Sequence, residues 1–218
     1  MDWILDVNVM LKNDITKITN SLLPPGFEGD VRSIRLMQDS LSKVIDRLGE
    51  QSAAEQGLSK VITTADKLRT ADSHTLYLIK DASARDGKGE VLGMLKVGRK
   101  HLFLFDEQQS VREVEPLCVL DFFVLRSCQR HGLGRALFDH MLERCELALF
   151  NIVACRAVQD MQTSAHRLAV DGPSDKMEAF LAKNYGVTRL LRQNNNFAML
   201  DAAEGHTERR AFHGQQIK

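Results

Sequence analysis

The turn between residues 129 and 135 combines residue types that suit binding of an anion. The apolar run LCVLDFFVL precedes it, and apolar positions of helical spacing follow it, which predicts a strand, a turn and a helix. Arg130, Gly132, Gly134 and Arg135 lie between the two. The start of a helix offers unpaired backbone N–H groups and a positive dipole end, and arginines add charge-assisted hydrogen bonds. A Cβ would hold a phosphate away from such a backbone, so the glycines favour a phosphate site.

The spacing of the turn selects among phosphate ligands. A dinucleotide-binding GxGxxG needs a third glycine where this chain has Leu137, and GxxxxGK[ST] is absent. The stretch QRHGLG (129–134) fits Q/R-x-x-G-x-G/A and resembles the turn of the GNAT acetyltransferase superfamily, which holds the pyrophosphate of acetyl-CoA. Six residues alone are equally compatible with a glycine-rich turn that binds nothing. The flanking strand and helix favour the phosphate site.

Longer stretches resemble one family within that superfamily, the α-tubulin N-acetyltransferases. The resemblance runs in order from residue 2 to residue 200 and is carried by VIDRLGEQSAAEQGLSKVITTADKL, HTLYLIKDASARDGKGEVLGMLKVGRKHLFLFD, EVEPLCVLDFFVLRSCQRHGLGRALFDHML, LAVDGPSDKMEAFLAKNYG and NNNFAM. It implies an α/β (α+β) fold, with a GNAT-like mixed, mostly antiparallel central sheet flanked by helices. Acetyl-CoA would bind at the glycine turn between the central strand and a helix.

The resemblance also implies which residues bind and react. Gln56, Cys118 and Asp171 match catalytic-site residues of the family. The acceptor would be a lysine on a loop of α-tubulin that faces the microtubule lumen. Contacts to acetyl-CoA are expected from the central strand, the turn and the helix after residue 173, namely Phe122, Phe123, Val124, Gln129, Arg130, His131, Gly132, Leu133, Gly134, Arg135, Ser174, Lys176 and Lys183. For the charged side chains of the turn, solvated surface positions are the alternative.

Acetyl transfer to lysine requires a neutral amine, and because a free lysine has a pKa of ~10.4, a group must accept its proton. Asp171 ends the apolar run LAVD and is our first choice for a general base or a carboxylate that orients the lysine. The alternative is an ordinary N-cap of the following helix. An amide is no base, so Gln56 is assigned to substrate positioning. With both substrates bound together, direct transfer needs no covalent enzyme intermediate.

Two residues of the predicted central strand have open alternatives. A carboxylate inside an apolar run needs a partner or a function, so Asp121 either pairs structurally or binds the substrate lysine. Cys118 is either a small buried hydrophobe or a wall and auxiliary proton acceptor of the active site. No neighbouring histidine is evident to activate it as a nucleophile.

Two features depart from the family pattern. Gly172 replaces the usual arginine after the aspartate, so a basic contact to substrate or cofactor is missing. Residues 145–165 form an atypical insertion where the family has a short acidic linker. The catalytic domain is therefore expected to span residues 1–201, with a polar, disordered tail over 202–218.

Composition limits the partners and the compartment. Lys+Arg and Asp+Glu both total 29, a net charge of +0, which argues against nucleic acid and anionic membranes as partners. The N-terminus does not resemble a signal peptide, and no apolar stretch approaches the ~18 residues of a membrane span. The cysteines lack CxxC spacing, so no metal site is expected, and they suit free thiols in the cytosol. The resemblance, together with the lack of a signal peptide pattern, implies a cytoplasmic protein on polymerised microtubules, including those of cilia or axons, and a monomer is expected.

The same patterns predict the surrounding elements. Residues 1–23 suit an edge strand or a short helix, and a helix from Ser33 is expected to stop at Gly49, followed by a loop that holds Gln56. Four strands are expected between residues 74 and 125, the fourth over EVEPLCVLDFFVL, with Pro116 near its start marking an edge or a bulge. A strand over 166–171, a helix over 174–186 and a terminal hairpin complete the chain.

Two other functions remain compatible with the residues. One is a GNAT enzyme with a different protein lysine or a small amine as acceptor. The other is a microtubule-binding protein in which the insertion and Gly172 have removed catalysis.

Overall fold

A computed structural model of the chain describes residues 6–105, 111–144, 168–187, 189–193 and 195–201. The predicted insertion and the predicted tail lie outside the described residues.

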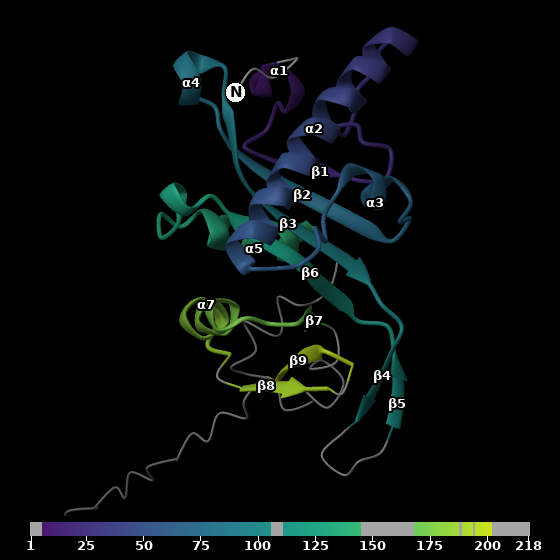
Figure 1. Cartoon of the computed structure of the whole chain (residues 1–218), viewed down its shortest axis with the longest axis vertical. Helices are drawn as coiled ribbons and strands as arrows, with labels where there is room; N and C mark the ends of the chain where they lie inside the picture. Colours follow the sequence, from purple (N-terminus) through teal and green to yellow (C-terminus); the bar gives the residue numbers. More distant parts are fainter. Residues whose placement is uncertain (1–5, 106–110, 145–167, 188, 194, 202–218) are drawn as a thin grey trace, which may run out of the picture.

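A seven-stranded sheet in the order β1-β2-β3-β6-β7-β9-β8 forms the centre of the fold (Figure 1). Its strands are β1 (Ile15–Ile18), β2 (His74–Asp81), β3 (Glu90–Arg99), β6 (Leu117–Val124), β7 (Leu168–Asp171), β8 (Arg189–Arg192) and β9 (Phe197–Asp201). Neighbouring strands are antiparallel except β6 and β7, which are parallel. The expected mixed, mostly antiparallel sheet is therefore confirmed.

A separate two-stranded hairpin extends from the end of β3 and consists of β4 (Leu102–Phe105) and β5 (Val111–Val114) (Figure 1). The prediction of one strand over EVEPLCVLDFFVL is wrong, because Pro116 separates β5 from β6. Proline has no N–H to donate to a strand ladder, so the chain leaves the hairpin there and enters the main sheet.

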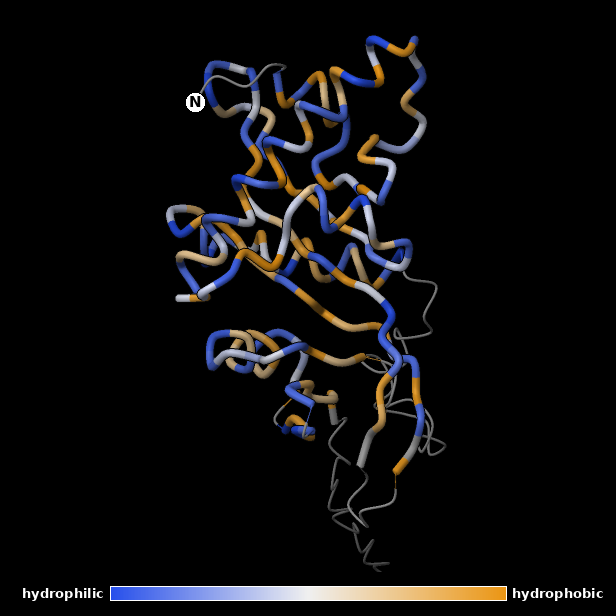
Figure 2. Tube along the Cα trace, turned by 45° about the vertical axis from the view of Figure 1, so that its right-hand side comes forward, coloured by the Kyte–Doolittle hydropathy of each residue, from blue (hydrophilic) through white to orange (hydrophobic). Residues whose placement is uncertain are grey.

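Helices cover both faces of the sheet. Helices α1 (Val7–Met10), α2 (Val31–Gln56) and α3 (Ala65–Arg69) pack on one face through a buried cluster that includes Leu41 and Phe123. Helices α5 (Leu133–Arg144) and α7 (Asp175–Tyr185) pack on the other through Phe138 and Leu181. Figure 2 shows hydrophobic residues concentrated along the strands between these layers. Burial on both faces explains why β6 is nearly continuous in apolar residues.

Several helices and strands form where local sequence patterns predict them. The N-terminal segment forms both the short helix α1 and the edge strand β1, and a helical turn, α4 (Ala84–Gly87), connects β2 to β3. Ser174 caps α7 by accepting a hydrogen bond from the N–H of Met177, and Gly186 ends that helix with φ 68°.

Helix α2 does not end at Gly49 but continues to Gln56, where Gly57 caps it with φ 66°. Gly49 has a different role, because a Cβ at this position would lie 1.8 Å from the carbonyl oxygen of Thr63. The glycine allows the loop after α2 to fold back against the helix. Because α2 continues past Gly49, Gln56, expected in a loop, is instead the last residue of the helix.

Candidate active site

The glycine turn has the geometry that its sequence predicts. A short 3₁₀ turn, η1 (Arg126–Cys128), follows β6, and the chain passes through Arg130 and Gly132 with φ 66° and 84° into α5. A Cβ at Gly134 would approach the ring of Phe122 to 3.2 Å. One glycine therefore suits the left-handed backbone, and the other lets the start of α5 pack closely on β6. The unpaired N–H groups of the first turn of α5 lie at this point.

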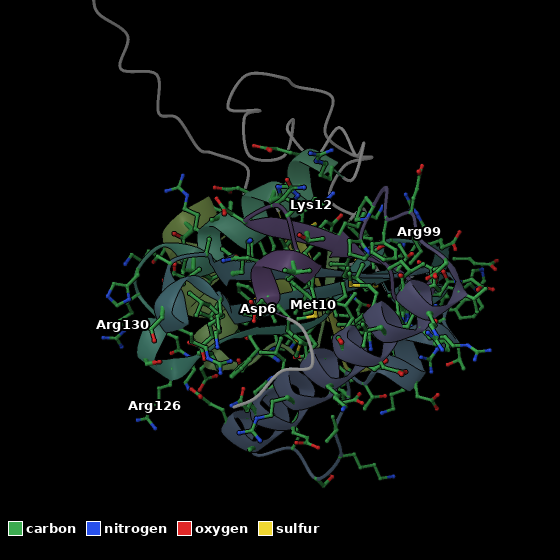
Figure 3. All side chains as sticks on the ribbon, turned by 90° about the horizontal axis from the view of Figure 1, so that it is seen from above. Asp6, Met10, Lys12, Arg99, Arg126 and Arg130 are labelled. Atoms are coloured by element: carbon green, nitrogen blue, oxygen red, sulfur yellow. The ribbon has the colours of Figure 1, made fainter. Side chains whose placement is uncertain are left out.

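An open cavity of ≈ 1060 Å³ lies beside this turn. Its walls come from the last turns of α2, the end of β6, the turn itself and the start of α7, namely Gln51, Ala54, Glu55, Phe123, Leu125, Arg126, Ser127, Gln129, Arg130 and Lys176. Figure 3 shows Arg126 and Arg130 on the same side of the molecule, away from Arg99. Three cationic side chains and one carboxylate line the cavity, so it suits an anion attached to an apolar group.

Four predicted cofactor residues line this cavity: Phe123, Gln129, Arg130 and Lys176. The side chain of Gln129 donates hydrogen bonds to the carbonyl of Val124 at 2.9 Å and to Glu55 at 3.2 Å. Lys176 also lies 3.8 Å from Glu55. These contacts join the turn, β6, α2 and α7 around the cavity.

Other predicted cofactor residues lie elsewhere. Phe122 packs against the rings of Phe138 and Phe180, on the face covered by α5 and α7. Arg135 contacts Asp139 one turn along α5, at 3.3 Å. His131 and Lys183 are exposed and do not line the cavity. Binding of acetyl-CoA by these residues, by Ser174 and by the backbone of Leu133 and Gly134 remains a prediction.

Strands β6 and β7 separate next to the cavity. Their pairing covers only Leu117–Val119 of β6, which then continues to Val124 while β7 ends at Asp171. Strand β3 pairs with the other edge of β6 as far as Val124. The second half of β6 therefore presents, on the β7 side, an edge whose backbone groups no described strand pairs with, and this edge leads to the glycine turn.

Asp121 lies in this second half of β6 and is only 4% exposed. A bulge between the pairs Lys96–Asp121 and Val97–Val119 sets its place in the register. Its carboxylate accepts hydrogen bonds from Ser52 at 2.9 Å, from Thr63 at 2.6 Å and from Gln56 at 3.3 Å. Of the two alternatives left open by the sequence, structural pairing is therefore found. Lysine binding by Asp121 remains a prediction, one that its burial does not favour.

Gln56 is anchored by this buried group. Its Nε2 donates to the hydroxyl of Ser52 at 2.7 Å as well as to Asp121, while the residue as a whole is exposed. The predicted positioning role thus has a physical basis, because two hydrogen bonds restrain a side chain that would otherwise be mobile.

Cys118 lies in the paired part of β6, opposite Ala169, and Asp171 directly follows the last residue pair of β6 and β7. Cys118 is fully buried with Ala169 and Met199, and its thiol lies 3.6 Å from the carbonyl of Pro116. Burial, with a further contribution from the negative charge of Asp171, raises the pKa of Cys118 to about 12. Asp171 is exposed at the end of β7, and Asn196 donates a hydrogen bond to it at 3.5 Å. The two predicted catalytic residues are therefore neighbours, one buried and one open to solvent.

Gly172, where the family has arginine, has φ 51°, and a Cβ there would lie 3.0 Å from Nδ2 of Asn196. Its N–H donates to the carbonyl of Asn196 at 2.9 Å. The glycine thus suits a left-handed turn that holds Asp171 beside the β8–β9 hairpin.

Sequence reasoning missed Ser52, Thr63, Lys96 and His74. Lys96 is buried, its Nζ donates to the carbonyl of Ile62 at 3.0 Å, and burial lowers its pKa although the charge of Asp121 opposes this. His74 packs where Gly98 leaves room, and within the described residues its Nδ1 is buried without a hydrogen bond. A polar residue on the apolar face of a helix or strand is the one signal that points to such positions.

A sequence profile of the family described as "GNAT acetyltransferase, Mec-17" matches residues 4–211. The chain belongs to this family. Alpha-tubulin N-acetyltransferase 1 of Drosophila melanogaster is 40% identical over 202 residues, which are 92% of this chain and 40% of that protein. The alpha-tubulin N-acetyltransferase of Trichoplax adhaerens is 39% identical over 210 residues, 92% of this chain and 81% of that protein. The family assignment made from the sequence is thereby confirmed.

The chain spans 40% and 38% of the lengths of the Drosophila melanogaster and Anopheles gambiae relatives. Solved structures overlap with it more loosely. Superposition on the acetyltransferase domain of xEco2, solved with a CoA conjugate, gives a TM-score of 0.42 at 11% sequence identity. The match covers 80% of this chain and 87% of the xEco2 chain.

Two absences hold for the described part of the chain. No group of three metal-ligating side chains gathers there. None of the helices in that part is long and apolar enough to cross a membrane.

Proposed function

We propose that this protein is an acetyl-CoA-dependent lysine acetyltransferase that modifies α-tubulin in microtubules. The observation that carries the proposal is the separation of β6 from β7 beside the glycine turn, in a chain of the GNAT family. That arrangement joins an anion-binding turn to an open strand edge, as a long phosphorylated thioester requires.

The cavity fits the cofactor chemically. Arg126, Arg130 and Lys176 supply positive charge for phosphates, and the turn supplies backbone N–H groups. The open edge of β6 offers N–H and C=O groups to the amide-containing arm of the molecule. The thioester would then lie near the middle of β6, between Gln56 and Cys118.

In the proposed reaction the neutral lysine amine attacks the thioester carbonyl, a C–N bond forms and the C–S bond breaks. Asp171 orients the amine and accepts its proton, directly or through water, and the CoA thiolate leaves and is protonated from solvent. A backbone N–H of the open β6 edge stabilises the negative charge on the carbonyl oxygen. Cys118 lies buried behind the site, and its thiol stays protonated at neutral pH.

The names of the relatives, which specify α-tubulin, support α-tubulin as the acceptor. The proposed substrate is a lysine of the lumen-facing loop of α-tubulin in polymerised microtubules. The proposed site of action is the cytoplasmic cytoskeleton, where the protein acts as a monomer by direct transfer in a ternary complex.

Titration calorimetry with acetyl-CoA tests the cofactor part of the proposal. The single variants Arg130→Ala and Lys176→Ala should each weaken binding several-fold, and Arg99→Ala, on the opposite side of the molecule, should not. Equal effects of all three variants would contradict binding at the cavity. Transfer of acetyl groups to amines or other proteins, but never to tubulin, would favour a GNAT enzyme with another acceptor.

A further inference from the structure

The carboxylate of Asp121 is an acceptor-only group directly beneath an exposed glutamine. Gln56 approaches it with Nε2 at 3.3 Å, and Ser52 bridges the two by accepting from Gln56 at 2.7 Å and donating to Asp121 at 2.9 Å. The hydrogen bonds thus run in one direction, from Gln56 through Ser52 to Asp121. Asp121 only accepts in this series of hydrogen bonds.

The direction of this chain decides which end of the carboxamide faces outward. A carboxylate cannot donate, so Nε2 must point inward and Oε1 must point away from Asp121. Within the described part of the chain Oε1 has no hydrogen-bond partner, so it is available as an acceptor for an N–H group of a substrate. Holding an exposed glutamine in one rotamer costs side-chain entropy, which the two hydrogen bonds offset.

Two further groups lie around the carboxylate of Asp121. Thr63 donates to its second oxygen at 2.6 Å, and Lys96 lies opposite it in the β3–β6 register. Thr63 and Gln56 do not contact each other in this network, because they bind different oxygens of the carboxylate. Two hydroxyl groups, those of Ser52 and Thr63, therefore donate to the same carboxylate, and only that of Ser52 contacts Gln56.

We propose that Asp121 and Ser52 are positioning residues that fix the carboxamide of Gln56 with its oxygen toward the acceptor substrate, and that Asp121 acts through Gln56 rather than on the lysine. This inference rests on the proposed acetyltransferase function. It assigns a task to a buried carboxylate that the transfer reaction itself does not use.

A double-mutant cycle tests the inference by measuring acetyl transfer to microtubules. Ser52→Ala should lower kcat on the order of ten-fold, because a misplaced contact group slows the reaction, while the KM for acetyl-CoA stays unchanged. In a Gln56→Ala background the same change should cost about two-fold or less, since the group that Ser52 positions is already gone. Asp121→Asn should behave in the same way.

Thr63→Ala is the matched control. It removes one hydroxyl from the same carboxylate, so it should lower the unfolding temperature about as much as Ser52→Ala but reduce kcat less. Equal losses of kcat in the wild-type and Gln56→Ala backgrounds would overturn the inference, because the residues would then act independently of Gln56.

A structural readout separates this inference from the proposed function. In wild-type protein labelled with ¹⁵N, the side-chain amide of Gln56 should exchange its hydrogens more slowly than that of a glutamine without such bonds, and Ser52→Ala should remove this protection. Unprotected Gln56 in the wild type would overturn the inference whatever the activity. Protected Gln56 in a protein that transfers no acetyl group to any acceptor would instead overturn the proposed function.

Discussion

At the scale of single residues, Cys118 and Asp171 differ in burial and therefore in the chemistry open to them. Cys118 is buried, whereas Asp171 is exposed. The thiol is fully buried and its pKa is raised to about 12, first by burial and then by the charge of Asp171. A thiol with that pKa is almost entirely protonated at neutral pH and is a poor nucleophile. Direct transfer, without an acetylated cysteine, is the route that this environment favours.

The coupling between the two groups can be measured. Because the negative charge of Asp171 disfavours the thiolate, Asp171→Asn should lower the pKa of Cys118 from about 12 and accelerate its alkylation at alkaline pH. The rate of iodoacetamide labelling against pH, read by mass spectrometry of the peptide containing Cys118, gives the pKa. Asp175→Asn, on an exposed residue at the start of α7, should leave it unchanged. Identical profiles for the wild type and Asp171→Asn would show that the groups are not coupled.

His74 gives the fold a defined sensitivity to acid. Burial, together with the positive charges of Lys96 and Lys100, lowers the pKa of His74 from 6.5 to about 4. In the unfolded chain this histidine binds a proton below about pH 6.5, whereas in the folded chain it does so only near pH 4. The contribution of His74 to stability is therefore complete above pH 6.5 and is lost as the pH falls from 6.5 to 4.

Replacing His74 should remove this component. Urea unfolding of His74→Gln should show a smaller loss of unfolding free energy between pH 7.5 and pH 5 than the wild type shows. The exposed His131 provides a control, since His131→Gln should leave the wild-type loss in place. Equal pH dependence in wild type and His74→Gln would contradict the assignment.

At the scale of elements, the contact between α2 and the loop that follows it sets the position of the Asp121 cluster. The carbonyl of Thr63 lies where a Cβ of Gly49 would be, and the hydroxyl of the same Thr63 binds Asp121. Any side chain at Gly49 must therefore move the loop away from the helix. The loop would then take Thr63 with it and disturb the cluster beneath Gln56.

Gly49→Ala should accordingly lower both stability and activity. A Cβ 1.8 Å from a backbone oxygen cannot be accommodated without a shift, and overpacking of this kind costs about 1–3 kcal/mol. Gly57→Ala is the control: it meets no atom within 4 Å and adds only the strain of a left-handed residue, about 1 kcal/mol. Thermal unfolding and acetyl transfer measure the two effects. A Gly49→Ala protein as stable and as active as the wild type would contradict the proposed packing.

Elements with local signals were predictable from the sequence, and contacts between distant segments were not. Three local features each determine structure within a few residues. They are the N-cap residue Ser174, the helical spacing of apolar residues in α5, and Gly132 in the turn. Gly49 resembles a helix stop, and only its contact with Thr63 explains why a glycine stands inside the helix. The partners of Asp121 lie 69 and 58 positions away, at Ser52 and Thr63, so no local pattern could connect them.

At the scale of the whole molecule, the predicted sites lie along one strand in the order that a long cofactor would require. The cavity lies at the Phe123 end of β6 and the Asp121–Gln56 cluster at its middle. Cys118 lies near the start of the strand, in the part paired with β7, and Asp171 directly follows the last pair, Val119–Val170. With about 3.3 Å per residue, the open edge from Leu120 to Val124 is about 13 Å long. The phosphates and the reacting lysine would thus occupy opposite ends of one open edge.

Acetylation of polymerised tubulin by the purified chain with acetyl-CoA, with every lysine of α-tubulin followed by mass spectrometry, tests this account most directly. The wild type should modify one lysine of the lumenal loop, and Asp171→Asn should reduce the rate at least on the order of 100-fold while still binding acetyl-CoA. Deletion of residues 145–160, in parallel, shows whether the insertion affects the rate. Modification at the same rate by Asp171→Asn, or no modification by a folded wild type that binds acetyl-CoA, would contradict the account.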